Sequence, residues 1–236
     1  MICKLCRKNA QLVKSHIIPE RFYKPLKNEK NHFMGIHGMG GKGWKALQSG
    51  LKETLLCFDC EQLLNDRYEK PFYKMWFGVS PIPQPFNFPE PYILKVNYKI
   101  VKMMHMSILY RAHVSRLNTF SDVNLGPHAE RIRKMLVDND AGTDLLYPIA
   151  GVVLLDSKRF VVQLVSCVQR FRFEGINAYR VAYGGLEWWC LISSQSDKPL
   201  EAMRLKQTGN FPVISTRWEN LNVVRAAHKI LTQKNQ

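Results

Sequence analysis

The sequence predicts an α+β protein with a cysteine-bearing N-terminal unit and a larger C-terminal unit. Three observations predict this class. Two Cys-x-x-Cys pairs lie within the first 60 residues, apolar residues recur at near-helical spacing over 92–117, and β-branched runs fill 147–194. The 236 residues are 46% hydrophobic and 22% charged, which is enough apolar sequence to build a core and excludes global disorder.

The N-terminal unit is expected at 1–78 and contains two cysteine pairs, Cys3 with Cys6 and Cys57 with Cys60. A single pair could serve redox chemistry. Two pairs in a chain whose start lacks a secretory signal favour a tetrahedral, structural zinc site made of four thiolates. The remaining cysteines, Cys167 and Cys190, stand alone in apolar sequence and are expected to be small buried side chains.

The segment between the two pairs is too long for a minimal zinc ribbon, whose pairs lie ~15–20 residues apart. It contains the run Ser15-His16-Ile17-Ile18-Pro19, a basic stretch over 21–30 and a glycine-rich stretch over 35–43. Glycines 38, 40 and 43 match a dinucleotide-binding pattern, but no convincing strand precedes them. A flexible basic loop is the better interpretation.

A helix is expected directly after the second cysteine pair. Glu61, Asn65 and Glu69 are spaced at i, i+4 and i+8, which places all three on one face of that helix. The alternative is a solvated helix face without a chemical role.

Five prolines between Pro81 and Pro91 predict an extended linker over 79–91, followed by a C-terminal unit over 92–236. In this unit we expect a mostly antiparallel sheet between helices. The predicted elements are a long helix over 92–117 with Pro91 at its first position, a second helix after Gly126-Pro127, strands at 149–155, 160–168, 171–173, 179–183 and 187–192, and a closing helix over 217–232.

The net charge of +15 is concentrated near the start, where residues 1–50 hold ten basic and two acidic side chains. Such a segment favours nucleic acid as the partner, because each neutralised phosphate releases counterions. A basic protein without a polyanion partner, or one that meets acidic membrane surfaces, is the alternative. The basic side chains expected at a nucleic-acid interface are Lys14, Arg21, Lys24, Lys27, Lys42 and Lys45.

No stretch is long and apolar enough to span a bilayer, which requires ~20 residues. The longest apolar run, 145–155, is interrupted by Pro148 and Gly151. We therefore expect a soluble, cytoplasmic protein that does not enter a membrane.

Cys-x-x-Cys, then a histidine followed by two aliphatic residues and proline, then Leu-Cys-x-x-Cys before a helix, resembles the HNH (His-Me finger, ββα-metal) endonucleases. The resemblance covers residues 1 to about 77 and is strongest to the branch with a four-cysteine zinc site. It implies a zinc-pinned treble-clef or ββα-metal domain. The remainder of the chain is similar to uncharacterised bacterial HNH-like proteins, some of them encoded near phage-defence genes, which suggests a setting in phage defence.

The resemblance implies that His16 is the general base and that a divalent cation, Mg²⁺ or Mn²⁺, is held by oxygen ligands. Glu61 occupies the position of a family ligand and Asn65 is the second choice. Ser15 stands where many members have Asp, and Gln48 could substitute for the middle Asn that orients the histidine.

The function expected from the resemblance is hydrolysis of phosphodiester bonds in DNA, with RNA as the alternative substrate. The C-terminal unit would select the target, bind a protein partner or pair with a second copy. A catalytically silent zinc-binding DNA-binding or regulatory module, or an adaptor of a larger nucleic-acid-processing complex, is the alternative function.

Overall fold

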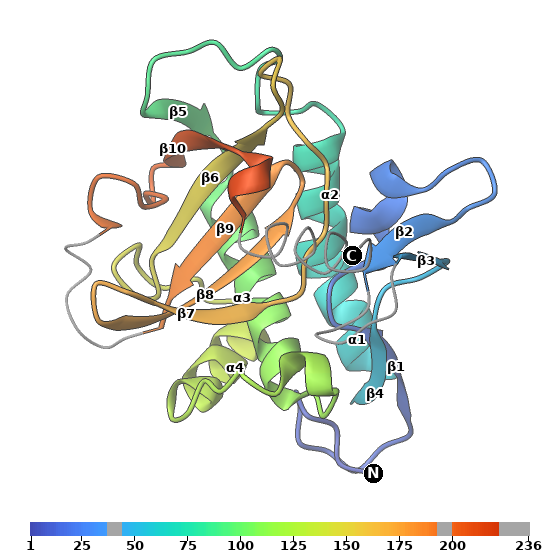
Figure 1. Ribbon diagram of the computed structural model, residues 1–236. Coiled ribbons are helices and arrows are strands. Elements are labelled where there is room, and N and C mark those ends of the chain that lie inside the picture. The colour runs from blue at the N-terminus through green and yellow to red at the C-terminus, as the bar shows by residue number, and fades with distance from the viewer. Residues whose placement is uncertain (37–43, 193–199, 222–236) are drawn as a thin grey trace.

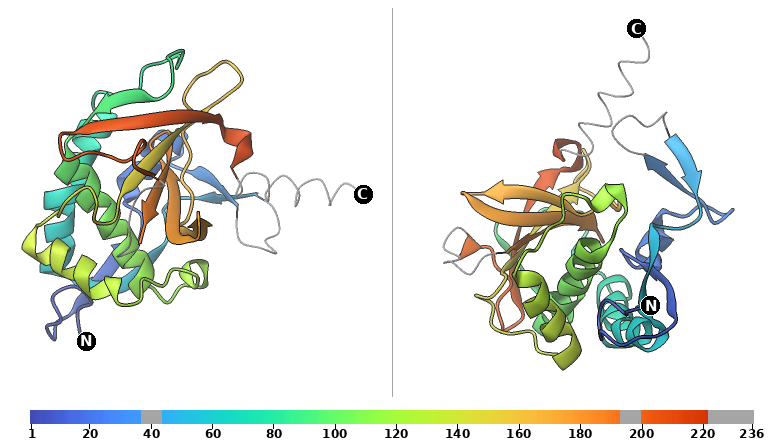
Figure 2. Two further views of the ribbon diagram at one scale, coloured as in Figure 1. Left: turned by 90° about the vertical axis from the view of Figure 1, so that its left-hand side faces the viewer. Right: turned by 90° about the horizontal axis from the view of Figure 1, so that it is seen from below.

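The computed structural model describes residues 1–36, 44–192 and 200–221, and Figures 1 and 2 show their arrangement. It confirms the predicted α+β class, with four clustered cysteines in the N-terminal part and a mostly antiparallel sheet. The closing helix expected over 217–232 lies largely outside the described residues.

Two antiparallel strands followed by a helix form the centre of the N-terminal part. Strand β1 pairs with β4, and α1 follows β4 directly and packs on both strands. An antiparallel hairpin, β2–β3, is inserted between them and projects from the molecule (Figures 1 and 2). The elements are β1 (Leu12–His16), the 3₁₀ helix η1 (Glu20–Leu26), β2 (Phe33–Ile36), β3 (Trp44–Leu47), β4 (Lys52–Cys57), α1 (Phe58–Leu64), the π-helical turn η2 (Asn65–Glu69) and α2 (Lys70–Phe77).

The C-terminal part is a six-stranded sheet in the order β5-β10-β6-β9-β8-β7. Neighbouring strands are antiparallel except for β6 and β10, which are parallel. The elements are β5 (Tyr92–Lys95), α3 (Tyr98–Val114), η3 (Asn118–Phe120), α4 (His128–Asp138), β6 (Ile149–Leu155), β7 (Gln169–Phe173), β8 (Ile176–Tyr183), β9 (Leu186–Leu191), β10 (Asn210–Arg217) and η5 (Trp218–Asn220).

Helix α3 lies between the sheet and the helices of the N-terminal part (Figure 2). Every residue from Val101 to Ala112 is buried, as expected for a helix covered on all sides. The ring of His105 in α3 contacts both neighbouring layers, because it packs against Phe72 of α2 and against Tyr183 and Trp188 of the sheet.

One continuous cluster of buried apolar side chains runs through both parts of the chain. The proline-rich segment over 79–91 contributes to it, since Ile82 and Phe86 are almost completely buried. The proposed boundaries at 78 and 92 stay predictions, but the segment between them packs against the core.

The helix predicted over 92–117 begins later than expected. Tyr92–Lys95 pairs with β10 as strand β5, and the Asn97 side chain accepts the Ile100 N–H at 3.0 Å and caps α3. The prediction that Pro91 opens the helix was therefore wrong. The chain first forms the edge strand β5, and the helix begins after its N-cap residue Asn97.

The prediction of a strand over 160–168 was also wrong. β9 and β10 occupy the two edges of β6 over most of its length, so this segment forms one isolated bridge, between Leu155 and Val161, and a few single backbone hydrogen bonds such as that from the Val162 N–H to the Leu154 carbonyl. Strand β10, which pairs with β6, was not predicted. Its last residue is Arg217, which was expected in a helix. The strands predicted over 171–192 and the helix after Pro127 are confirmed. In the part of the chain that is described, no helix has the length and apolar character needed to cross a membrane.

Candidate zinc and nuclease site

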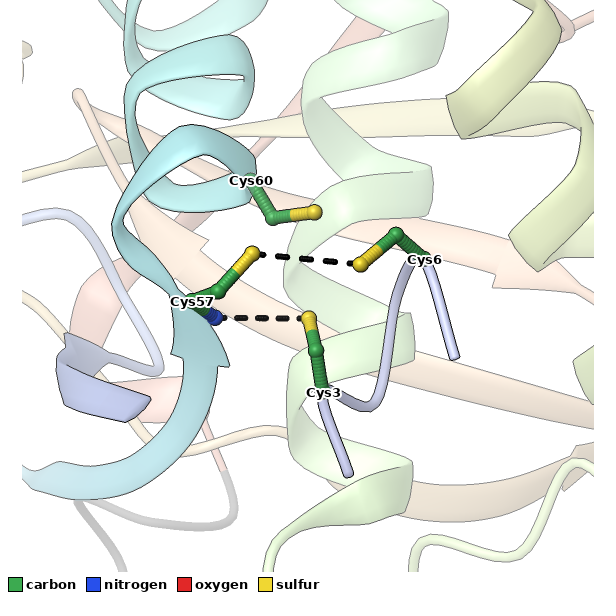
Figure 3. A group of neighbouring side chains, drawn as sticks. All are labelled: Cys3, Cys6, Cys57 and Cys60. Atoms are coloured by element: carbon green, nitrogen blue, oxygen red, sulfur yellow. Dashed lines mark hydrogen bonds between the residues drawn. The ribbon is translucent and has the colours of Figure 1, made fainter. Parts of the chain in front are cut away.

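The four cysteines of the N-terminal part come together, as predicted (Figure 3). Cys3 and Cys6 lie in the first loop, Cys57 ends β4 and Cys60 lies in the first turn of α1. Their Sγ atoms all lie within 4.8 Å of one another, and Cys6 Sγ is 3.8 Å from Cys57 Sγ. Among the described residues, no other cluster of three or more His, Cys, Asp or Glu ligands has this spacing.

This donor set fits a metal ion such as zinc. A tetrahedral zinc with Zn–S distances of ~2.3 Å separates its sulfurs by about 3.8 Å, close to the spacing observed here. Burial raises the pKa of the Cys3 thiol, but hydrogen bonds from backbone N–H groups, including that of Cys57, outweigh it and lower the pKa to about 7. These bonds favour the thiolate of Cys3, the form of cysteine that binds metal, whereas burial and the neighbouring thiols raise the pKa values of Cys57 and Cys60.

The C-terminal part holds the first cysteine loop in place. The Tyr110 hydroxyl of α3 donates to the Lys4 carbonyl, and Arg133 Nη1 of α4 donates to the Leu5 carbonyl at 2.7 Å. The Lys4 N–H donates to Leu55 of β4 at 3.1 Å. Both the strand pair and the two C-terminal helices therefore position the cysteines.

A second polar site lies at the other end of the strand pair. In the β1–β4 register Cys57 is opposite Leu12 and His16 is opposite Lys52, so His16 and the cysteine cluster are at opposite ends of β1. A cavity of about 230 Å³ opens beside His16. Its lining residues are His16, Glu20, Arg21, Phe58, Glu61, Gln62, Asn65 and Glu69.

Three buried polar atoms in this region have no hydrogen bond of normal geometry: Ser15 Oγ, His16 Nε2 and Glu61 Oε2. Among the described residues they are the complete set of buried side-chain nitrogen and oxygen atoms in this condition. His16 and Glu61 line the cavity, and Ser15 lies close enough to Glu61 to lower the pKa of its carboxyl group. Buried polar groups are nearly always hydrogen-bonded, so three such atoms in one place indicate a site made for a ligand.

His16 is suited to act as a base. Burial and the nearby Lys52 lower its pKa, against the opposing effect of Glu20 and Glu69, so the imidazole is neutral near pH 7. Its Nε2 atom lies 3.0 Å from Glu20 Oε2, although the ring N–H does not point along this contact, and the atom counts as unpartnered by hydrogen-bond geometry.

Glu61 lies one residue after Cys60, so the cysteine cluster fixes its backbone. Burial raises the pKa of its carboxyl group, while Arg111 and Ser15 lower it and Glu69 raises it further. A divalent cation bound to the carboxylate would offset the cost of burying its negative charge. Mg²⁺ and Mn²⁺ prefer oxygen ligands such as a carboxylate. The residues present therefore fit a hard cation.

Asn65 and Glu69 line the same cavity as Glu61, as their spacing predicted. The π-helical turn begins at Asn65, and such turns are frequent at functional sites. Asn65 Oδ1 accepts a long hydrogen bond from Arg21 Nη2 at 3.4 Å. Glu69 is paired with Arg111, at 2.8 Å between Oε1 and Nη1.

Gln48, expected to orient His16, lies elsewhere. Its Nε2 atom is 3.1 Å from His32 Nε2 on the exposed side of the hairpin, and Gln48 is not among the residues that line the cavity. The nearest carboxylate to the His16 ring is instead that of Glu20, which sequence reasoning missed. Its position four residues after the histidine was the available signal.

The predicted nucleic-acid contacts are placed unequally. Lys14, Lys24 and Lys45 are exposed, and Arg21 reaches the cavity. Lys27 is committed to an ion pair, with Nζ 2.6 Å from Glu20 Oε1. Lys42 lies outside the described residues. Arg21 and Lys24 both lie over the Tyr73 ring, at 5.6 and 5.8 Å from its centroid.

A larger cavity of about 310 Å³ lies near the ends of β6 and β10. Its polar side chains already have partners, since Ser215 donates to Glu90, Arg159 Nε donates to Phe86 and Arg217 donates to Asp156. The smaller cavity, where the unpartnered atoms lie, is therefore the better candidate for a functional site.

No known family model, curated protein or solved structure matches the chain.

Proposed function

We propose that the chain is a metal-dependent endonuclease of the HNH type that hydrolyses phosphodiester bonds in DNA. The observation that carries this proposal is the convergence of unpartnered polar atoms from Ser15, His16 and Glu61. In the proposal His16 is the base, Glu61 is the first-choice cation ligand, and Ser15 occupies the position of the family's Asp. A ββα arrangement beside a cysteine cluster able to hold zinc supports the same proposal.

In the proposed reaction His16 accepts a proton from a water molecule as the water oxygen attacks phosphorus. The new P–O bond forms while the bond to the leaving sugar oxygen breaks, and solvent protonates that oxygen. A bound Mg²⁺ or Mn²⁺ would stabilise the negative charge on the phosphate and the leaving oxygen. Glu61 is the proposed principal ligand of this cation, with Asn65 and Ser15 as neutral oxygen donors.

The surroundings of the cavity suit a polyanionic substrate. Arg21 reaches both Asn65 at the cavity and the face of Tyr73, and Lys24 lies over the same ring. Side chains with this combination of positive charge and an aromatic face contact phosphates and bases in many nucleic-acid-binding proteins. Arg21 is therefore the basic residue proposed to contact the phosphate nearest the cut.

A plasmid-nicking assay with Mg²⁺ or Mn²⁺ tests the proposal. Wild-type protein should nick DNA, and His16→Ala should lower the rate by ~10²–10⁴, the range typical for loss of a general base. DNA affinity and zinc content should be retained, because the imidazole acts in the transition state. His32→Ala, a histidine of the hairpin region outside the cavity, is the matched control.

Two results would contradict the proposal. Cutting by His16→Ala at the wild-type rate would remove His16 from the mechanism. Metal-independent binding of DNA without cutting, across substrates and metals, would favour the silent zinc-binding module.

A further inference from the structure

The Glu20 carboxylate is held from two directions by groups that are not part of the cavity. Lys27 Nζ donates to Oε1 at 2.6 Å, and the Gly50 N–H donates to Oε2 at 3.1 Å. These two bonds lower the pKa of Glu20 against the effect of burial, so the group stays charged. The result is a fixed anion at the start of η1.

This anion faces the His16 ring. Glu20 Oε2 is 3.0 Å from His16 Nε2, and the backbone carbonyl of His16 is itself held by Arg111 Nη1 at 2.7 Å. The ring nitrogen is buried and the described residues offer it no aligned hydrogen bond. Catalytic hydrogen bonds are often poorly aligned before substrate binds, and a small rotation of the imidazole would align this one.

We propose that Glu20 is the positioning residue for His16 and that it accepts a hydrogen bond from Nε2–H, which leaves Nδ1 as the atom that takes the proton from water. A carboxylate can only accept, so its neighbour on a neutral imidazole must be the protonated nitrogen. The role of Nδ1 as proton acceptor rests on the proposed function.

The same geometry assigns a different role to Lys27. Sequence reasoning placed it at the DNA interface, but its ammonium group is half-buried against Glu20. Lys27 therefore acts by holding Glu20, and its loss should affect the turnover rate rather than DNA binding.

The first experiment measures the tautomer of His16 by NMR of protein with ¹⁵N-labelled histidine, with His16→Ala used to assign the signals. Wild-type protein should show His16 protonated on Nε2. In Glu20→Gln the new amide group can donate to Nε2, so the Nε2–H form should be lost or mixed with the Nδ1–H form. Glu29→Gln, which changes an exposed acid shortly after η1, should leave the His16 signals unchanged.

The second experiment measures DNA cleavage by the same variants, with zinc content and circular dichroism as checks on folding. Loss of a residue that orients a catalytic group typically costs about 10–100-fold. We expect a decrease of this size in kcat for Glu20→Gln, and a smaller one for Lys27→Met, with KM for DNA unchanged in both. Glu29→Gln should cut at the wild-type rate.

The two readouts separate the positioning role from the proposed function. An Nδ1–H form in the wild-type protein, or a tautomer that Glu20→Gln does not change, would overturn the positioning role. A rise in KM for Lys27→Met without a change in kcat would return Lys27 to the DNA interface and contradict its role here. If the tautomer responds as expected but no DNA is cut, the contact stands and the endonuclease proposal fails.

Discussion

Arg111 and Glu69 form a buried ion pair, with Nη1 2.8 Å from Oε1 and no solvent exposure of the arginine side chain. The guanidinium comes from α3, while the carboxylate ends the π-helical turn of the N-terminal part. The same Nη1 atom donates to the His16 carbonyl at 2.7 Å, and Nη2 donates to Ser107 Oγ at 3.1 Å. One side chain of the C-terminal part therefore fixes two residues of the candidate site.

Replacing Arg111 by methionine should be strongly destabilising. Removing one partner of a buried ion pair leaves the other charge uncompensated, which costs about 3–5 kcal/mol. The free energy of unfolding, measured by denaturant titration, should fall by this amount. Arg116→Met changes an exposed arginine just beyond the same helix and should have little effect. Equal stability of the two variants would show that the pair does not hold the site together.

The cysteine cluster should contain zinc and depend on it. Freshly purified protein is expected to carry about one zinc per chain, and Cys57→Ser should lose the metal and unfold the N-terminal part, because metal binding contributes folding free energy. Cys167→Ser changes a half-buried cysteine outside the cluster and should keep its zinc. Elemental analysis and circular dichroism provide the readouts. Folded wild-type protein free of any metal would contradict the assignment.

Glu61→Gln should weaken cation binding more than Ser15→Ala. A hard divalent ion gains more from a carboxylate than from an amide or a hydroxyl, and Glu61 is the buried carboxylate without a partner for Oε2. Titration of cleavage with Mg²⁺ should show a large rise in the concentration needed for half-maximal rate in Glu61→Gln, with the fold intact. Equal shifts in both variants would mean that the cation is held differently.

Acid should destabilise the fold through His105, the buried histidine between the layers. Burial lowers its pKa to about 3, against about 6.5 in an unfolded chain. Between these values the unfolded state binds a proton that the folded state does not, so the free energy of unfolding decreases as pH falls from about 6.5 towards 3. The slope contributed by this group is at most ~1.4 kcal/mol per pH unit.

The measurement is the pH dependence of the free energy of unfolding in wild type and in His105→Gln. The glutamine side chain can replace the imidazole contacts with the Val101 carbonyl and the Tyr183 hydroxyl, each 2.7 Å in the wild type, without taking up a proton. The variant should show a flatter slope below pH 6.5. His113→Gln changes a half-buried histidine on the same helix and serves as the control.

Local sequence patterns predicted much of the fold. The cysteine spacing predicted the cluster of four thiols. Helical spacing predicted that Glu61, Asn65 and Glu69 share one face, and they line one cavity despite the π-helical turn. The parallel strand β10 was not predictable in this way, because its pairing with β6 joins residues more than 60 positions apart. The strand predicted over 160–168 failed for the same reason: a β-branched run has no ladder to join once both edges are taken.

The candidate site shows the same division between local and distant contacts. His16 and Ser15 followed from a short motif, whereas Glu20 required knowledge of the turn after Pro19 that brings its carboxylate back to the ring. The buried acid that pairs with Arg111 is Glu69, and only the packing of α3 against the π-helical turn identifies it.

The contacts of the first cysteine loop have a consequence for synthesis of the chain. Cys3 and Cys6 leave the ribosome before the other two cysteines of the cluster, Cys57 and Cys60, and before Tyr110 and Arg133, whose side chains hold the Lys4 and Leu5 carbonyls. At ~5–20 residues per second, roughly 6–25 s separate Cys6 from Arg133. The first cysteine loop is therefore made well before the contacts that complete it, and its thiols stay open to oxidants and to competing metals until Cys57 and Cys60 follow.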